Sequence, residues 1–517
     1  MSVEILNRAV VRERDPLQDL CGVIGAFSSD NFLFFNHGVT GLEKLETRGH
    51  DGAGVFATST HGNIVLNFKG VGRVREVFTD KVIEEKRKTE AQMWIMQTRW
   101  GTNGDVNTPE ASIQPVFREH EETGDFIVVA HNGEFETKDR NGPVSDTVLF
   151  TEKLAKSKGA DWQERIVSTL MENPDADDAY SLIIGTPEGM FLVRDPHAYR
   201  PLSYGNYWDE LVGDFVWVAA SETHALSKMG IGEYTEVLPG QIVHFAKNKP
   251  PVTTQFAKPD PKLCLFENVY VARVNSRVHV PRSSSEEINQ AQRVGEFRWR
   301  SGEILAREAP LTSEDVDFVT GIPGTAISGA KGFAAACELP YDQVIHDIDP
   351  EDHERTFLMA DIANIYGEVL RGFSFDEDDI RGKKIALGDD SIVRNNVMRA
   401  VVRYLKELGA ISVHGRVFCA PVENICTHGL NTRSRNELGA ARILMEVGED
   451  ISDELLAEMM GKSIGLDSLA YLSLGGTIEA AVGDPNADCF CTECMRPTYV
   501  ATTSVDFPNL DAKIRAT

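Results

Sequence analysis

The stretch Cys21-Gly22-Val23-Ile24-Gly25-Ala26-Phe27 places a cysteine directly before an apolar, strand-like run. A thiol needs a base to become a nucleophilic thiolate. A cysteine at a chain terminus carries that base in its own α-amino group, whose pKa of about 8 suits proton transfer at neutral pH. The use of Cys21 in this way requires removal of residues 1–20, which we expect to be a propeptide. The alternative is a buried structural cysteine, because a thiol in an apolar strand usually behaves as a small hydrophobic group.

The pattern of apolar segments changes about halfway along the chain. The first half contains short apolar strands separated by Gly, Asn and Asp, of which the clearest are 127–130, 181–184 and 215–220. The Lys-, Pro- and Asp-rich segment 247–262 predicts a linker. Beyond it, strands such as 317–320 and 384–387 alternate with helical patterns such as 397–408, which is typical of a parallel α/β domain. The expected organisation is a propeptide at 1–20, a strand-rich domain at 21–255, an α/β domain at 256–480 and a C-terminal tail at 481–517.

Composition and charge exclude several classes of protein. With 517 residues, 42% hydrophobic and 25% charged, the chain has the composition of a large globular protein. The net charge of −27 repels the phosphates of a long nucleic acid. No apolar run is long enough to cross a bilayer, and the first twenty residues alternate charged with apolar groups, unlike a secretory signal. We therefore expect a cytoplasmic protein with no nucleic-acid or membrane partner, in which the acidic run 376–379 is a solvated loop.

Four further strings stand in a fixed order after Cys21. They are Arg48-Gly49-His50-Asp51-Gly52-Ala53-Gly54, Thr98-Arg99-Trp100-Gly101-Thr102-Asn103-Gly104, His131-Asn132-Gly133-Glu134 and Ser145-Asp146. Together with Cys21 they resemble the glutaminase domain of class II glutamine amidotransferases, an N-terminal-nucleophile hydrolase fold of stacked antiparallel sheets. The resemblance implies that the first half of the chain hydrolyses the side-chain amide of glutamine.

The same resemblance implies a role for each polar residue of the site. Arg99 binds the α-carboxylate of glutamine, Asp146 binds its α-ammonium group, and Asn132 with the Gly133 N–H stabilises the tetrahedral oxyanion. A forked cation, a carboxylate and amide donors are the groups that such a reaction needs. Taken separately, the residues have simpler interpretations: a surface ion pair for Arg99, a helix N-cap for Asp146 and a hairpin turn for Asn132-Gly133.

The second half contains an apolar strand that ends in paired acids, Ile385 to Arg394, with Asp389 and Asp390 followed by Ser391. Paired carboxylates at this place can hold Mg²⁺ or ribose hydroxyls, and the alternative is a solvated turn. The string resembles the phosphoribosyl diphosphate (PRPP) signature of phosphoribosyltransferases, and 318–328 resembles the pyrophosphate loop of the amidophosphoribosyltransferase family. The resemblance implies that Asp389, Asp390, Ser391 and Thr325 bind the acceptor, with Mg²⁺ at the two aspartates.

Two segments depart from the family pattern. After Arg394 the family has Gly-Thr-Thr, whereas this chain has Asn395-Asn396-Val397, which lacks both hydroxyl donors. The segment Asp347 to Glu354 is acidic where the family carries a basic stretch over PRPP. Such a reversal changes a Coulomb energy of about 1 to 4 kcal/mol per charge pair. We therefore predict weakened use of PRPP, either because the acceptor is a different, less anionic molecule or because the second site has become a scaffold of a regulatory protein.

Four of the eight cysteines form a possible metal site. Cys491 and Cys494 make a C-x-x-C, and Cys264 and Cys426 lie far upstream. These positions resemble the ligands of the [4Fe–4S] cluster in the propeptide-bearing branch of amidophosphoribosyltransferases. Zinc bound by the same thiolates is the alternative. Of the remaining cysteines, Cys337 and Cys419 are expected in the core, and Cys489 could compete as a ligand.

The sequence as a whole predicts an α+β glutaminase domain followed by an α/β phosphoribosyltransferase-fold domain. By resemblance, the protein hydrolyses glutamine and passes ammonia to an acceptor, which in the family is PRPP and gives 5-phosphoribosylamine for purine synthesis. The expected cofactors are a [4Fe–4S] cluster and Mg²⁺. The expected partners are glutamine, a small-molecule acceptor and further copies of the chain in a homo-oligomer.

Overall fold

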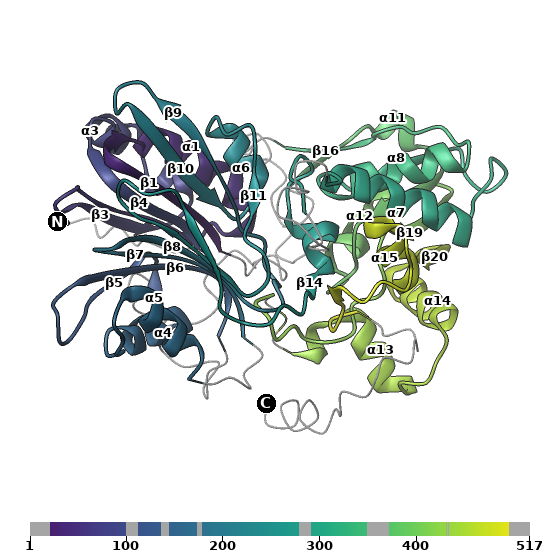
Figure 1. Cartoon of the computed structure of the whole chain (residues 1–517). Helices are drawn as coiled ribbons and strands as arrows, with labels where there is room; N and C mark the ends of the chain where they lie inside the picture. Colours follow the sequence, from purple (N-terminus) through teal and green to yellow (C-terminus); the bar gives the residue numbers. More distant parts are fainter. Residues whose placement is uncertain are drawn as a thin grey trace, which may run out of the picture.

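The computed structural model describes residues 21–99, 112–135, 144–172, 178–278, 291–348, 372–430, 432 and 434–495. Figure 1 shows two lobes side by side, the first coloured from purple to teal and the second from green to yellow. Within the described residues, every helix is too short or too polar to cross a membrane.

Two antiparallel sheets form the first lobe (Figure 1). The seven-stranded sheet has the order β11-β9-β10-β1-β4-β2-β3. Its strands are β1 (Gly22–Leu33), β2 (Gly52–Thr58), β3 (Ile64–Val71), β4 (Glu90–Arg99), β9 (Ser203–Asp209), β10 (Asp214–Ala220) and β11 (Thr235–Glu236). The six-stranded sheet has the order β13-β12-β8-β7-β6-β5. Its strands are β5 (Val116–Glu119), β6 (Phe126–Glu134), β7 (Ala179–Thr186), β8 (Gly189–Arg194), β12 (Gln241–Phe245) and β13 (Val252–Gln255).

Alternating side chains of these strands build three apolar layers. Along β1, Val23 and Phe27 enter the core between the two sheets, whereas Ile24 and Ala26 face the helices outside. The outer face of the first sheet packs against α1 (Phe35–Leu45), α2 (Val74–Val77), α3 (Asp80–Lys86) and α6 (Thr223–Lys228), with η1 (Glu46–Arg48) following α1. The second sheet is covered by α4 (Asp146–Leu154) and α5 (Trp162–Leu170).

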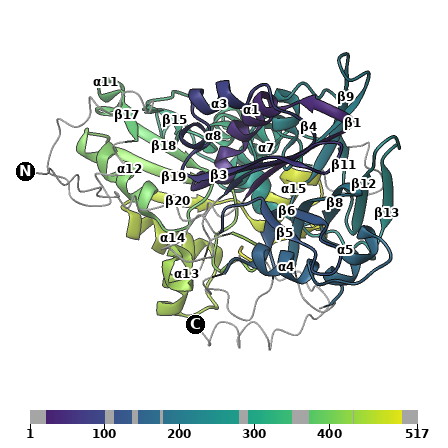
Figure 2. The same cartoon turned by 90° about the vertical axis from the view of Figure 1, so that its left-hand side faces the viewer.

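The second lobe is built on a four-stranded parallel sheet, order β15-β18-β19-β20, whose strands Figure 2 shows one after another. The strands are β15 (Phe318–Gly321), β18 (Lys384–Asp389), β19 (Ser412–Val417) and β20 (Ser468–Tyr471). The helices are α7 (Val294–Glu308), α8 (Ala326–Ala336), α12 (Asn396–Glu407), α13 (Gly439–Val447), α14 (Asp453–Ile464) and α15 (Leu474–Val482). β16 (Ile345–Asp347) and β17 (Phe373–Phe375) form a two-stranded antiparallel sheet, and α11 (Glu377–Ile380) and η6 (Arg435–Glu437) are short turns of helix. Stacked antiparallel sheets followed by a parallel α/β sheet are the predicted fold class, which is confirmed.

A short irregular segment connects the lobes. It contains β14 (Leu263–Cys264), which pairs in parallel with β21 (Phe490–Cys491), and the π-helix η3 (Glu267–Val271). Arg298 of α7 holds this π-helix, because its guanidinium donates to the carbonyls of Asn268, Val269 and Ala272 at 3.0, 3.0 and 2.8 Å. Burial lowers the pKa of Arg298 to about 10. Because π-helical turns are rare and cluster at functional sites, this joint is a candidate functional element.

Two sequence predictions about local structure are wrong. Segment 247–262 is not only a linker, because β13 lies within it and pairs with β12 at the edge of the second sheet. The acidic run 376–379 is exposed to solvent, as predicted, but it is not a loop, because Glu377, Asp378 and Asp379 form the first turn of the short helix α11. Negative charges are stabilised at that end of a helix, which local composition alone did not indicate.

Candidate active sites and cysteine cluster

Cys21 lies immediately before β1 and is partly exposed. Two hydrogen bonds hold the start of this strand, Val23 N–H to Ser221 Oγ at 3.0 Å and Ser221 N–H to the Val23 carbonyl at 3.1 Å. Gly22 has no room for a side chain, since an added Cβ would lie 2.6 Å from Leu45 Cβ and 2.7 Å from Thr98 Oγ1. The thiol therefore sits at a fixed strand end open to solvent, where it can meet a small substrate.

Asn132 and Gly133 lie inside β6, opposite Ser181 and Tyr180 of β7, so the hairpin-turn interpretation is wrong. The side chain of Asn132 is fully buried, and within the described chain neither its Nδ2 nor its Oδ1 has a hydrogen-bond partner. Gly133 has φ +143°, and a Cβ there would lie 2.0 Å from the carbonyl oxygen of Ala179. A buried amide with an unused donor is costly unless a ligand pairs with it, and it suits a developing oxyanion.

Asp146 opens α4 beside the end of β6. The N-cap of this helix is Ser145, whose Oγ accepts from Val148 N–H at 3.4 Å, so Asp146 is not the cap. Instead, Asp146 Oδ2 accepts from the Phe135 N–H at 3.0 Å and lies 3.7 Å from His131 Nδ1. Asp146 is thereby held beside His131 and Phe135, which stand before and after the Asn132-Gly133 pair of β6.

Hydrogen bonds of Gln97 and Gln114 hold the strand around His131, and the Gln97 bond links the two sheets. Gln97 Nε2 of β4 donates to the His131 carbonyl at 3.2 Å, and Gln97 is also the register partner of Val23 in β1. Gln114 Oε1 accepts from the His131 N–H at 2.6 Å, and Gln114 Nε2 donates to Thr147 Oγ1 at 3.0 Å. Burial lowers the pKa of His131, against the opposing effect of Asp146. The strand that begins after Cys21 is in this way tied to the strand that carries Asn132.

Arg99 ends β4 and is 6% exposed, so it is not a surface side chain. Its carbonyl accepts from the Asp51 N–H at 2.8 Å, which places the 48–54 string beside it. The rest of the Arg99 string, residues 100–104, lies outside the described residues. Sequence reasoning assigned no role to Gln97 or Gln114, and no local motif marks Gln114.

Asp389 and Asp390 end β18 at the carboxyl edge of the parallel sheet. They are 8% and 7% exposed, so the solvated-turn interpretation is wrong. Thr325 Oγ donates to Asp390 Oδ2, and Ser391 Oγ donates to Asp390 Oδ1 at 2.5 Å. All four side chains line a cavity of about 330 Å³. The carboxyl edge of a parallel sheet is the usual ligand position in α/β folds.

The loop after Arg394 has an unusual backbone. Asn395 is left-handed, with φ +70°, and buried, and within the described residues its Oδ1 has no hydrogen-bond partner. Gly439 makes room for it, since a Cβ there would lie 2.0 Å from Asn395 Oδ1. Arg394 pairs with Glu437. Of the acidic segment that was predicted to repel PRPP, residues 349–354 lie outside the described residues, and only Asp347 and Ile348 are placed.

The cavity beside Asp389 and Asp390 is lined from both lobes, because Thr47 of the first lobe joins Tyr270 and Val271 of the π-helix in its wall. The residue after Thr47 is Arg48, which is fully buried and pairs with Glu222 and Glu267, each at 2.6 Å. Burial alone would lower the pKa of Arg48, but Glu267 and Glu222 raise it.

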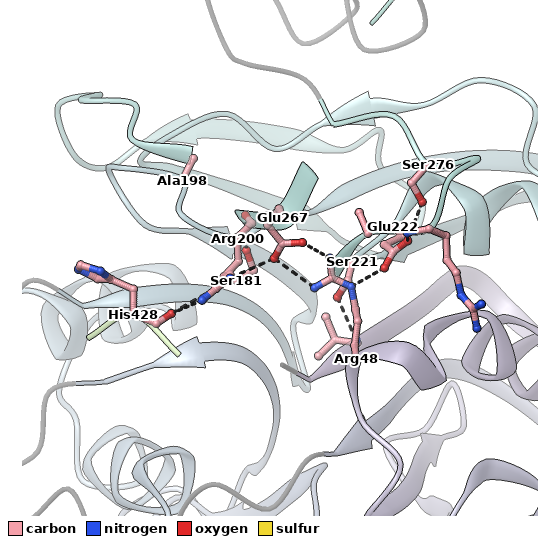
Figure 3. Close-up of polar contacts among 12 residues, drawn as sticks. Arg48, Ser181, Ala198, Arg200, Ser221, Glu222, Glu267, Ser276 and His428 are labelled. Carbon is pink, nitrogen blue, oxygen red and sulfur yellow. Dashed lines mark hydrogen bonds and ion pairs between the residues drawn. The ribbon is translucent and has the colours of Figure 1, made fainter. Parts of the chain in front are cut away.

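Glu267 also binds Arg200 at 3.2 Å, and Arg200 Nη2 donates to the His428 carbonyl at 2.6 Å. Figure 3 shows this buried chain of contacts from Arg48 to His428. Four charged side chains form this series of contacts, and each is at least 97% buried: Arg48, Glu222, Glu267 and Arg200. Sequence analysis did not find these ion pairs, which join residues far apart in the chain.

The four predicted metal ligands come together at the joint between the lobes. Cys264 and Cys491 are register partners in β14 and β21, and Cys426 and Cys264 lie close enough to Cys494 to add to the rise in its pKa that burial causes. Cys426 Sγ accepts from the N–H groups of His428 and Leu430 at 3.3 and 3.4 Å. Burial raises the pKa of Cys264 to about 11 and also raises the pKa of the other three thiols. At neutral pH such thiols stay protonated unless a bound metal displaces the proton. Four convergent sulfurs of this kind fit an iron–sulfur or zinc group.

Two further donors lie beside this cysteine set. His428, Cys491 and Glu493 offer ligand atoms within 4.8 Å of one another, and sequence analysis missed His428 and Glu493. Cys419 is in the core, as expected, whereas Cys337 is partly exposed at the end of α8. Cys489 is partly exposed, and its carbonyl accepts from the Leu263 N–H at 3.0 Å.

Comparison with known proteins gives matches along nearly the whole chain. The amidophosphoribosyltransferase of Synechocystis is 31% identical over 510 residues, which covers 94% of this chain and 92% of that protein. The human amidophosphoribosyltransferase is 30% identical over 503 residues, which covers 90% and 89%. The solved glutamine PRPP amidotransferase of B. subtilis, complexed with ADP and GMP, has a TM-score of 0.74 at 25% identity and covers 94% of this chain and 98% of its own. No protein-family model matches the chain.

Proposed function

The chain belongs to the amidophosphoribosyltransferase family, and from that membership we propose how each of its sites works. It is a class II glutamine amidotransferase, which hydrolyses glutamine in the first lobe and transfers the ammonia to an acceptor in the second lobe. The acceptor is PRPP, and the product is 5-phosphoribosylamine for purine synthesis. The assignment of individual residues below is our proposal.

Cys21 is the nucleophile after removal of residues 1–20 has freed its α-amino group. The amine takes the thiol proton while the sulfur bonds to the amide carbon of glutamine, and the carbonyl electron pair moves onto oxygen. Asn132 Nδ2 and the Gly133 N–H donate to that oxyanion. The amine then returns the proton to the leaving nitrogen, and ammonia departs from a γ-glutamyl thioester. Water hydrolyses the thioester, which gives glutamate and restores the thiol.

Two charged groups hold the amino-acid end of glutamine. Arg99, buried at the end of β4, binds the α-carboxylate, and Asp146, at the start of α4, binds the α-ammonium group. A guanidinium and a carboxylate on opposite sides of the substrate select a free amino acid over a peptide amide. Both residues lie on elements tied to β6, so substrate position and oxyanion geometry are set by one scaffold.

The acceptor site uses Asp389, Asp390, Ser391 and Thr325. Two buried carboxylates beside two hydroxyls fit Mg²⁺ and the hydroxyls of a ribose, and Mg²⁺ supplies charge neutralisation for a leaving pyrophosphate. Ammonia attacks the sugar carbon that carries the pyrophosphate, and that bond breaks as the new carbon–nitrogen bond forms. Weakened use of PRPP, predicted from 395–397 and 347–354, stays a prediction, which a raised KM for PRPP would support.

Cys264, Cys426, Cys491 and Cys494 are the residues that would hold an iron–sulfur cluster or zinc. When bound, such a group supplies folding energy by joining three distant segments. Because β14 and β21 carry two of the four sulfurs, these ligands tie the C-terminal segment to the segment between the lobes. A homo-oligomer stays a prediction.

The proposal is carried by the buried side-chain amide of Asn132, which has no hydrogen-bond partner among the described residues and lies on a strand tied to the strand that follows Cys21. We test it with Cys21→Ala, measuring glutamate release and PRPP-dependent pyrophosphate release. The proposal expects loss of glutamine hydrolysis by at least about 1,000-fold, with pyrophosphate release retained when ammonium chloride replaces glutamine. Unchanged glutamate release in this variant would refute the proposal for the first site. Loss of the ammonium-dependent reaction would refute the separation of the two sites.

A further inference from the structure

We propose that Gly429, in the loop around Cys426, is a positioning residue for amide hydrolysis, because its lack of a side chain leaves the Gly133 backbone in place beside it. The inference rests on the proposed oxyanion role of Gly133 and adds a residue from the other lobe to that site. Gly429 touches no substrate in this account. It acts through the strand end that carries the oxyanion donors.

The space between these glycines is tight for a methyl group. A Cβ on Gly429 would lie 3.2 Å from the carbonyl carbon of Gly133, 3.4 Å from its carbonyl oxygen and 3.5 Å from Arg200 Nη2. The 3.2 Å distance is closer than two carbon atoms normally approach, so the Gly133 backbone would have to give by a few tenths of an ångström. Gly429 also has φ +102°, in the region that favours glycine.

The loop that presents Gly429 is held on several sides. The Cys426 N–H donates to Thr432 Oγ1 at 2.6 Å, and Cys426 Sγ accepts from two N–H groups of the same loop. The carbonyl of His428 accepts from Arg200 at 2.6 and 3.2 Å, and the His428 ring stacks on Tyr199 with ring centres 4.0 Å apart. A loop restrained in this way transmits a displacement to its neighbour and does not absorb it.

Arg200 provides a second connection to the same strand end. Its carbonyl accepts from Ser181 Oγ at 3.0 Å (Figure 3), and Ser181 is the register partner of Asn132. Asn132 is therefore connected through Ser181 to Arg200, and Gly133 lies beside Gly429. By contrast, the proposed substrate-binding groups lie on other elements, Arg99 at the end of β4 and Asp146 at the start of α4.

This difference predicts a specific kinetic defect. A shift of Gly133 weakens a donor that acts on the oxyanion, which exists in the transition state, and leaves substrate binding unchanged. Loss of one whole donor costs about 100- to 1,000-fold in kcat. A displacement of a few tenths of an ångström should cost less, and we expect about tenfold in kcat with KM for glutamine within twofold.

The test compares Gly429→Ala with Gly448→Ala in the full chain. Gly448 has φ +106°, and a Cβ there meets no atom within 4 Å, so it controls for the backbone conformation alone. We measure kcat and KM for glutamine, and affinity for glutamate γ-semialdehyde, whose aldehyde forms a tetrahedral adduct with the thiol. We also measure the rate of Cys21 alkylation by iodoacetamide, which needs no oxyanion donor, and the metal content.

The inference is supported if Gly429→Ala has a tenfold lower kcat and a similarly weaker affinity for the aldehyde. Its alkylation rate and metal content should be unchanged, and Gly448→Ala should behave like wild type. Equal kcat in the two variants overturns it, as does a fall in kcat without weaker aldehyde binding or with loss of metal. If Gly429→Ala does not fold, Thr432→Val against Thr432→Ser decides, because only the former removes the acceptor for Cys426 N–H. A wild type without Cys21-dependent glutaminase activity would instead reject the proposed function.

Discussion

Replacement of Glu267 by Gln should destabilise the protein more than any loss of a surface ion pair. The Glu267 carboxylate contacts Arg48 at 2.6 Å and Arg200 at 3.2 Å, and all three side chains are fully buried. With Glu222, the four charges sum to zero, so Glu267→Gln leaves a net buried charge of +1.

The magnitude follows from two opposing energies. Each lost ion pair is worth about 4 kcal/mol at 4 Å and an effective dielectric constant of about 20. Against this, the variant no longer has to desolvate a carboxylate, which returns several kcal/mol. We therefore expect a net loss of about 3 to 5 kcal/mol in the free energy of unfolding, as is found when one partner of a buried pair is removed.

The assay is urea unfolding followed by tryptophan fluorescence, with Glu152→Gln as the matched control. Glu152 pairs with Arg118 at 3.0 Å, but their side chains are 45% and 39% exposed. Loss of such a surface pair should cost less than about 1 kcal/mol. If Glu267→Gln costs no more than Glu152→Gln, the description of the joint as a buried charge network is refuted.

Three other predictions concern the acceptor site, pH and metal. Asp390→Asn should lower PRPP-dependent pyrophosphate release about 100-fold or more while glutamate release persists, and an equal loss of both would argue against separate sites. Because burial lowers the pKa of His131, the unfolded chain binds its proton first, so stability is full above pH about 6.5 and falls below it. His131→Asn should reduce the pH dependence of the free energy of unfolding, measured in urea, by up to about 1.4 kcal/mol per pH unit. An unchanged pH dependence would exclude His131 as its source. Cys426→Ser should lower the bound iron or zinc measured by elemental analysis, and full metal content would remove Cys426 from the ligand set.

Local sequence patterns predicted the elements that carry the chemistry. An apolar run after Cys21 became β1, and the run before Asp389 became a strand of the parallel sheet. The roles of Asn132 and Asp146 were inferred from family resemblance, which depends on the order of all five strings together. Taken alone, each string had a simpler interpretation, because a dipeptide such as Asn-Gly is common in turns.

Contacts between distant residues could not be predicted in the same way. Glu267 meets Arg48 across 219 positions, and Thr47 reaches a cavity built mainly by the second lobe. Such pairs depend on how the lobes pack, which neither periodicity nor turn chemistry records. The strand β13 was missed because its short Val-Thr-Thr-Gln run, although favourable for a strand, lies in a Lys- and Pro-rich segment whose composition predicts a linker, and its pairing with β12 is a long-range contact.

The central claim is that a terminal amine beside a sulfur drives hydrolysis of glutamine, and intact-mass spectrometry of the active protein tests it most directly. After treatment with a diazoketone analogue of glutamine, we predict a chain that begins at Cys21 and carries one adduct on that residue. An active protein that retains residues 1–20, or that is inactivated by an adduct elsewhere, would contradict the claim.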